Sequence, residues 1–126
     1  MIKLLLILAA VSGFLSVGLG AFGAHGLRDK LPANLMSAFE TGVQYQFTHT
    51  LAVIFCCVLA YQFERAIWFQ YAAVSFLLGI LLFSGSLYGL ALTGMKWLGP
   101  VTPLGGLMFL LGWALMLVAM VKHVGH

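Results

Sequence analysis

Few side chains in this 126-residue chain could do chemistry, and the most versatile are His25, Glu40 and His49. Two imidazoles and a carboxylate could hold a first-row transition metal if the fold brought them together. Their spacing does not require such a site, because the chain contains no HxxxH or CxxC pattern. It also contains no nucleophile elbow, Walker loop or paired carboxylates. We therefore expect no catalytic residue, metal or cofactor, and we keep a metal-dependent or redox membrane enzyme only as an alternative.

The composition places these side chains in a membrane. The chain is 63% hydrophobic and only 7% charged, whereas soluble domains are about 25% charged. This excludes a soluble globular domain, a disordered chain, a coiled coil and a disulfide-stapled secreted module. The six basic residues are scattered and form no patch. We therefore expect no nucleic-acid partner, and we expect the cations to contact membrane lipid.

The positions of the charged residues predict the number of membrane crossings. They leave four uncharged stretches, at residues 4–27, 41–63, 66–95 and 97–121. A helix needs about 20 residues to cross the hydrocarbon, so each stretch suffices for one crossing and not for two. The backbone must satisfy its own hydrogen bonds in lipid, which favours helices. We expect an all-α membrane protein with one domain over residues 1–126. Its four antiparallel transmembrane helices form an up-down-up-down bundle at about 2–24, 43–63, 67–92 and 103–121.

The connection over residues 25–42 has the pattern of a short interfacial helix. Pro32 suits the first turn of a helix. Apolar residues then recur at every fourth position, with polar residues between them, as in an amphipathic helix: Leu35, Phe39, Val43 and Phe47. We expect this helix to lie at the membrane interface and to bend or run into the second transmembrane helix.

Small residues predict where the helices approach each other closely. They recur every fourth position in the first helix, at Ser12, Ser16, Gly20 and Ala24. Gly85 and Gly89 form a second such pair in the third helix. Trp113 falls near the middle of the fourth helix, so we expect it to pack inside the bundle or against another subunit. These features favour a homo-oligomer.

The topology gathers the unusual polar residues in one half of the bundle. The first and second helices are joined on the same side of the membrane as the third and fourth. Polar groups at membrane depth are costly and face protein or water. We therefore predict a polar pocket at the end opposite the termini, formed by His25, Glu40, Gln44, Tyr45, His49, Ser84, Ser86, Tyr88 and Thr102. The alternative, which stays open, is that these side chains only satisfy one another at the helix junctions.

The orientation of the chain is finely balanced. Four crossings put both termini on one side, and each side then has three basic residues: Lys3, Arg65 and Lys122 against Arg28, Lys30 and Lys96. The terminal amine and the C-terminal histidines, His123 and His126, tip the positive charge toward the side of the termini. We expect these two histidines in solvent. We expect a multi-pass protein of the bacterial cytoplasmic (inner) membrane, with both termini in the cytoplasm.

Several motifs carry a resemblance to a known family. Residues 20–27 read GAFGAHGL, Tyr45 and His49 form a Y-x-x-x-H, residues 85–88 read GSLY and residues 102–106 read TPLGG. The chain resembles the small membrane proteins grouped as domain of unknown function 423, whose eukaryotic relative is called transmembrane protein 256. The resemblance implies a compact multi-span membrane protein and implies no activity.

These observations lead to two main hypotheses for function. The first is a small non-enzymatic binding or transport module whose polar pocket accepts a lipid headgroup or another small amphipathic ligand. The second is a structural or accessory subunit of a larger membrane complex.

Overall fold

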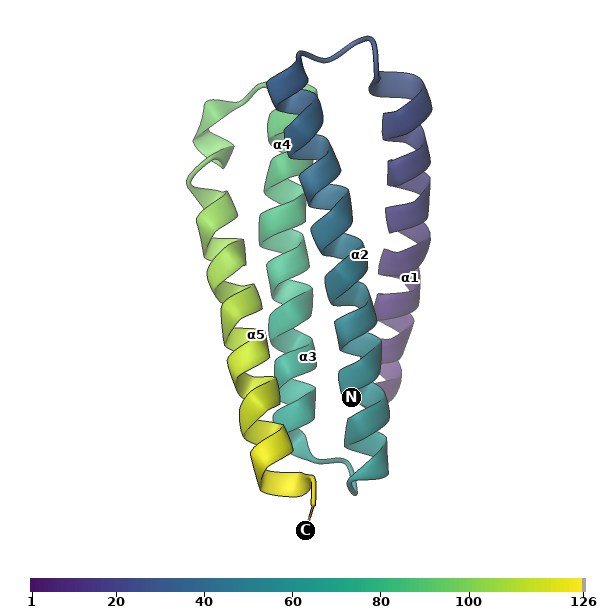
Figure 1. Cartoon of the computed structure of the whole chain (residues 1–126), viewed down its shortest axis with the longest axis vertical. Coiled ribbons are helices and arrows are strands. Elements are labelled where there is room, and N and C mark those ends of the chain that lie inside the picture. The colour runs from purple at the N-terminus through teal and green to yellow at the C-terminus, as the bar shows by residue number, and fades with distance from the viewer. Residues whose placement is uncertain (126) are drawn as a thin grey trace.

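The computed structural model describes residues 1–125 as a bundle of long helices (Figure 1), and His126 lies outside the described residues. Two of the membrane-length helices contain a π-helical turn, and a 3-10 turn precedes the last helix. The elements are α1 (Ile2–Phe22), η1 (Gly23–Leu27), α2 (Ala33–Gln62), α3 (Ile67–Gly79), η2 (Ile80–Ser84), α4 (Gly85–Thr93), η3 (Lys96–Leu98) and α5 (Val101–His123).

These elements join into four helices that are long and apolar enough to cross a membrane: Ile2–Leu27, Ala33–Gln62, Ile67–Thr93 and Lys96–His123. The shortest has 26 residues, or about 39 Å at 1.5 Å per residue, which exceeds the ~30 Å of hydrocarbon. The predicted all-α membrane fold with four transmembrane helices is therefore confirmed.

Consecutive helices run in opposite directions. Ser12 of α1 hydrogen-bonds Thr50 of α2, whereas Gly20, further along α1, lies against Val43, which comes earlier in α2. Both ends of the chain lie at the same end of the bundle (Figure 1). α1 packs along α2, α2 packs on α3 and α4, and α3 packs on α5. The outermost helices, α1 and α5, therefore expose more of their surface than α2 and α3.

The expected interfacial helix is not a separate element. Its residues form the first part of α2, which continues without a break from Ala33 to Gln62. Pro32 precedes the helix with ψ of 153°, and the next proline is Pro100. With no breaker, the polar and apolar parts join into one helix of 30 residues, about 45 Å long. About a third of α2 therefore exceeds the thickness of the hydrocarbon.

Glycines and aromatic rings interlock α3 and η2 with α5. A Cβ added at Gly112 would meet the ring of Phe76, one at Gly79 would meet the ring of Phe109, and one at Gly105 would meet the backbone of Phe83. These contacts allow the two helices to approach closely. The core continues between α2 and α3 through Val53, Cys56, Phe69 and Ala73, all fully buried.

The small-residue predictions are right for α1 and wrong for the third transmembrane helix. Ser12 and Ser16 are buried against α2, although Ala24 is exposed. A Cβ at Gly85 would meet nothing, and one at Gly89 would meet only Leu98, in the adjoining loop. The close helix contacts use Gly79, Gly105 and Gly112 instead, because those glycines face a neighbouring helix.

The C-terminal end also differs from expectation. His123, expected in solvent, is partly buried beside the rings of Phe63 and Phe69, at 6.4 and 6.2 Å between centroids. The expectation for His126 lies outside the described residues.

Candidate functional site

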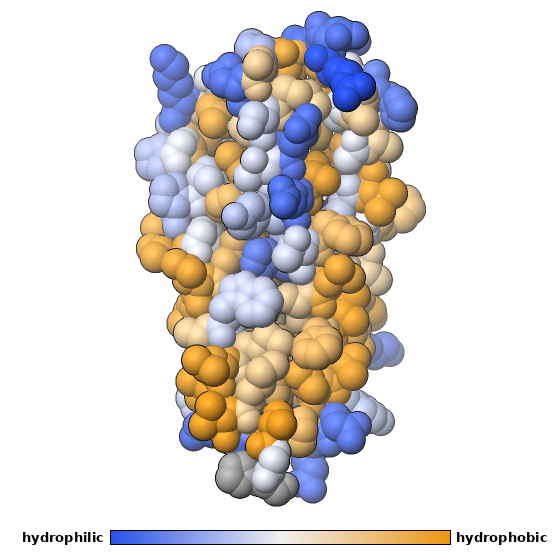
Figure 2. Space-filling view, in the orientation of Figure 1, coloured by the Kyte–Doolittle hydropathy of each residue, from blue (hydrophilic) through white to orange (hydrophobic). Residues whose placement is uncertain are grey.

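The polar half of the molecule is evident on its surface. Figure 2 shows hydrophilic side chains at the end opposite the termini, and they continue over the first half of α2 to the middle of the molecule. The predicted polar residues there belong to four different features. These are a buried hydrogen-bond network, a histidine surrounded by aromatic rings, a hydrogen-bonded contact between two helices, and an outward-facing groove.

Gln46 is the centre of the buried network between α1, α2 and α4. Its Nε2 donates to the carbonyl oxygen of Ser12 at 3.1 Å and to the Ser12 hydroxyl at 3.2 Å. Its Oε1 accepts a hydrogen bond of 2.5 Å from the Tyr88 hydroxyl. Ser12 also shares a hydrogen bond of 2.7 Å with Thr50. One amide therefore ties three helices together.

Tyr88 of α4 and Ser84, the last residue of η2, fix the position of this part of the helix against α2. The Ser84 hydroxyl donates to the carbonyl oxygen of Gly42 at 2.7 Å. The Tyr88 ring lies over Gly42, where an added Cβ would be 2.8 Å from Tyr88 Cε1, and packs on Phe39 at 5.2 Å between centroids. Both predicted site residues thus stabilise a helix contact.

His49 lies in an aromatic cage between α2, α3 and α5. The imidazole stacks on Phe109 at 3.8 Å between centroids and lies near the rings of Tyr45 and Phe76. The indole N–H of Trp113 donates to His49 Nε2 at 3.1 Å. Nε2 is therefore the unprotonated nitrogen, and Nδ1 donates to the carbonyl oxygen of Tyr45 at 2.8 Å. Both ring nitrogens have partners within the protein.

Replacing Trp113 with Phe should lower the free energy of unfolding by about 1 kcal/mol, because it removes one hydrogen bond and leaves the buried His49 Nε2 without a donor. Thermal unfolding in detergent measures the change. Trp97→Phe is the control, since Trp97 is 66% exposed and should shift stability by no more than ~0.5 kcal/mol. Equal effects of the two substitutions would contradict the role of the His49–Trp113 bond.

Ser86 and Thr102 form a clip between α4 and α5. The Ser86 hydroxyl donates to the carbonyl oxygen of Phe83 at 2.9 Å. Ser86 therefore accepts from the Thr102 hydroxyl, which lies 2.6 Å away. The contact holds together the ends of the two helices that the loop with η3 connects.

The remaining predicted residues face outward. A groove of about 270 Å³ lies between the end of α1 and the first part of α2, and Glu40, Gln44 and Arg28 line it. Its floor includes Gly23 and Phe39, and a Cβ added at Gly23 would be 2.8 Å from Phe39 Cε1. The GAFGAHGL segment thus supplies the glycine that lets η1 lie on α2.

The predicted residues therefore do not line one pocket. Glu40 and Gln44 line the groove, while His49, Ser84, Ser86, Tyr88 and Thr102 are bonded to other parts of the bundle. His25 and Tyr45 are exposed. Within residues 1–125 every buried side-chain nitrogen and oxygen has a hydrogen-bond partner, and no three His, Cys, Asp or Glu side chains lie close enough to hold a metal ion.

Sequence reasoning missed Arg28 as a lining residue and Thr50 as a member of the buried network. It counted Gln46 among the polar residues of this half of the bundle but did not separate it from Gln44. Arg28 follows the GAFGAHGL segment directly, so its position at the end of the first uncharged stretch was a usable signal. Gln46 differs from Gln44 only by its place around the helix. No feature of the sequence distinguishes the two, because both flank the same polar segment.

The fold and these contacts define a small multi-span integral membrane protein with a polar end. The chain belongs to the family described as Protein of unknown function (DUF423), whose model matches residues 19–106, so the resemblance in the sequence is confirmed. It is 49% identical over 120 residues to the UPF0382 inner membrane protein YgdD of Escherichia coli, covering 95% of this chain and 91% of that protein. It is 42% identical over 128 residues to the UPF0382 membrane protein YwdK of Bacillus subtilis, covering 97% and 99%.

A UPF0382 membrane protein of Staphylococcus haemolyticus is 45% identical over 123 residues, covering 98% of this chain and 99% of that protein. No solved structure matches the chain. Its bacterial relatives are membrane proteins, and four helices can cross a membrane. The chain is therefore a multi-pass protein of the bacterial cytoplasmic membrane, as predicted.

Proposed function

We propose that this protein is a non-enzymatic binding module for a zwitterionic phospholipid. The headgroup, with its phosphate and its ammonium, occupies the groove between α1 and α2. The observation that carries the proposal is the pair of opposite charges, Arg28 and Glu40, that line the same groove. The phosphate faces the Arg28 guanidinium, which suits phosphate geometry, and the ammonium faces the Glu40 carboxylate.

The groove lies at headgroup depth. Glu40 is seven residues from the start of α2 at Ala33, or about 10 Å along the helix axis. α2 exceeds the hydrocarbon thickness by about 15 Å, so Glu40 fits in the interfacial layer. The groove's volume of about 270 Å³ is just below the ~300–1,000 Å³ typical of ligand pockets. This space suits a headgroup, with the acyl chains outside in the bilayer.

Binding is favoured over transport because the polar side chains between the helices bond one another. Gln46 is bonded to Ser12 and Tyr88, and His49 is bonded to Trp113. A transported solute would have to break these contacts and would leave buried polar groups without partners. In the groove, the exposed polar side chains of Glu40 and Gln44 can contact a ligand without breaking any of these hydrogen bonds.

Native mass spectrometry of the purified protein with phosphatidylethanolamine tests the proposal. We expect Arg28→Gln and Glu40→Gln each to weaken binding roughly fivefold, since an exposed charge contact is worth up to about 1 kcal/mol. Phosphatidylcholine should bind the unmodified protein more weakly, because its nitrogen has no hydrogen to donate to Glu40.

The matched controls are the neighbouring charges Asp29 and Lys30, which are exposed and do not line the groove. Asp29→Asn and Lys30→Gln should bind phosphatidylethanolamine as the unmodified protein does. If they lose as much affinity as Glu40→Gln and Arg28→Gln, the groove is not the binding site.

A second candidate, a subunit of a larger complex or homo-oligomer, is favoured by one observation. A stripe of exposed polar residues follows α2 at helical spacing toward the middle of the helix: Asn34, Ser37, Thr41, Gln44 and Thr48, with Thr41 partly exposed. Polar side chains at membrane depth usually face protein or water, so another chain would cover this stripe. The mass of the particle purified in mild detergent distinguishes a monomer with bound lipid from a stoichiometric complex.

A further inference from the structure

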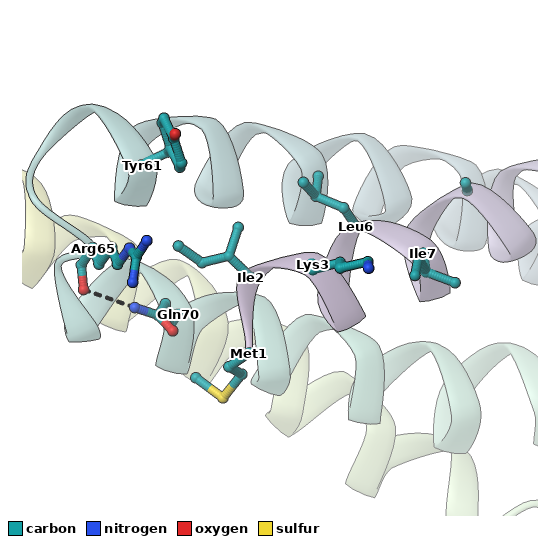
Figure 3. A pocket seen from close by; sticks show the side chains of 9 residues that line it. Met1, Ile2, Lys3, Leu6, Ile7, Tyr61, Arg65 and Gln70 are labelled. Carbon is teal, nitrogen blue, oxygen red and sulfur yellow. Dashed lines mark hydrogen bonds between the residues drawn. The ribbon is translucent and has the colours of Figure 1, made fainter.

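A second groove lies at the opposite end of the bundle, beside the termini. It has a volume of about 600 Å³ and lies between the start of α1 and the α2–α3 turn. Figure 3 shows Tyr61, Arg65 and Gln70 around one side of this groove and the first residues of α1 on the other. The residues that line it include Lys3 and Ala10 of α1 and Arg65 and Gln70 at and after the turn.

The groove has two cationic side chains and no acidic side chain in its lining. Lys3 comes from α1 and Arg65 from the α2–α3 turn, and both are exposed. Of the three acidic residues in the chain, Glu64 is at this end, next to Arg65, but it does not line the groove. The local charge therefore favours a ligand with a net negative charge.

The α2–α3 turn holds Arg65 in a defined position. Glu64 and Arg65 both have positive φ, at 55° and 62°, a conformation that non-glycine residues adopt at a cost. The Arg65 backbone N–H donates to the carbonyl oxygen of Ala60 at 2.7 Å. The Gln70 amide donates to the Arg65 carbonyl oxygen, also at 2.7 Å. The backbone that carries the guanidinium is therefore fixed from two sides.

An apolar groove continues from this charged end along α1 and α2. It has a volume of about 640 Å³ and meets the first groove at Ala10, which lines both. Gly13 and Gly18 lie along it, and a Cβ added at Gly18 would meet nothing within 4 Å. From Lys3 to Gly18 the two joined grooves together follow α1 for about 22 Å, longer than the ~15 Å of one hydrocarbon leaflet. An acyl chain can therefore lie in the groove over its full depth in the leaflet.

We propose that these joined grooves bind one anionic glycerophospholipid. Its phosphate lies between Lys3 and Arg65, and one acyl chain follows Ala10, Gly13 and Gly18. The site is separate from the Arg28–Glu40 groove and prefers an anionic headgroup to a zwitterionic one. A headgroup ammonium would lie beside the two cationic side chains, and no carboxylate lines the groove to bind it. It gives each end of the molecule its own class of lipid.

Native mass spectrometry with phosphatidylglycerol and the full chain in detergent tests this site. A Lys or Arg near a membrane surface is worth about fivefold in affinity for anionic lipid. We expect the Lys3→Gln/Arg65→Gln variant to bind phosphatidylglycerol about 25-fold more weakly, which is the product of the two fivefold losses. Lys3→Gln alone, which leaves the α2–α3 turn unchanged, should lose about fivefold and keeps the test valid if the double variant does not fold.

Three controls separate a lipid site from general attraction to charge. The Lys30→Gln/Lys96→Gln variant removes the same charge from the other end of the bundle and should change affinity less than twofold. Gly18→Leu fills the apolar groove and should weaken phosphatidylglycerol binding severalfold with every charge in place. Glycerol phosphate, which has the phosphate without acyl chains, should not displace the lipid at hundredfold excess.

The proposal is overturned if Lys30→Gln/Lys96→Gln loses as much affinity as Lys3→Gln/Arg65→Gln, because the attraction is then general. It is also overturned if Gly18→Leu has no effect or if glycerol phosphate displaces the lipid. Binding of phosphatidylethanolamine serves as the internal reference, since it should respond to Glu40→Gln and not to Lys3→Gln.

Discussion

Gly105→Ala should lower the free energy of unfolding by about 3 kcal/mol, the largest effect we expect from a single methyl group. The added Cβ would meet the backbone nitrogen of Phe83 and would lie 2.6 Å from Phe83 Cα. Backbone atoms cannot rotate away as a side chain can, so α5 must move as a whole. Overpacking of this kind typically costs about 1–3 kcal/mol, and the shift also loosens the 2.6 Å hydrogen bond from Ser75 to the Met108 carbonyl oxygen.

The adjacent residue provides the control for this substitution. A Cβ at Gly106 would meet only Phe83 Cδ2, at 4.0 Å, which is ordinary contact. Gly106→Ala adds the same methyl group to the same turn of α5 and should change stability by less than ~1 kcal/mol. Thermal unfolding of the two variants in the same detergent measures the difference. Similar stabilities for both would show that α5 does not approach η2 as closely as described.

Gln46→Leu should lower the free energy of unfolding by about 2 kcal/mol. The substitution removes both hydrogen bonds to Ser12 and the acceptor of the Tyr88 hydroxyl. Hydrogen bonds between membrane helices are worth about 0.6 kcal/mol each on average, and a buried hydroxyl left without a partner costs about 1–3 kcal/mol. Gln44→Leu is the matched control, because Gln44 is exposed, and it should change stability by less than ~0.5 kcal/mol.

A double-mutant cycle checks the mechanism of this effect. Tyr88→Phe removes the hydroxyl that Gln46→Leu leaves without an acceptor, so the second substitution should cost less in the Gln46→Leu background than in the unmodified protein. We expect a coupling of about 1 kcal/mol between the two positions. Additive effects would mean that Tyr88 and Gln46 do not share a hydrogen bond.

The sequence predicts the crossings of this protein well because a membrane imposes a requirement along the chain. The length of each uncharged stretch and the charges at its ends are enough to place four helices. The boundary of α2 is harder to predict. The polar segment after Pro32 has the pattern of an interfacial helix, yet no residue between it and the apolar segment breaks the helix, so the two parts join.

The candidate site is only partly predictable because the sequence does not fix the rotation of each helix about its axis. Gln44 and Gln46 are two positions apart, which is about 200° around an α-helix. One therefore lines the outer groove while the other bonds Ser12 in the interior. Gly85 and Gly105 differ in the same way, since only Gly105 faces a neighbouring helix. In a membrane helix both faces are apolar, so hydrophobic periodicity does not reveal which face is buried.

The most direct test compares the roles of the groove and of the buried network. Native mass spectrometry measures how much phosphatidylethanolamine each folded molecule retains in the Glu40→Gln and Gln46→Leu variants. If the groove binds lipid and the network holds the helices, Glu40→Gln loses lipid and keeps its thermal stability. Gln46→Leu then loses stability, and the fraction that remains folded keeps its lipid. The account is contradicted if the Gln46→Leu variant releases its lipid while the Glu40→Gln variant retains it. That result would place the ligand among the buried polar residues.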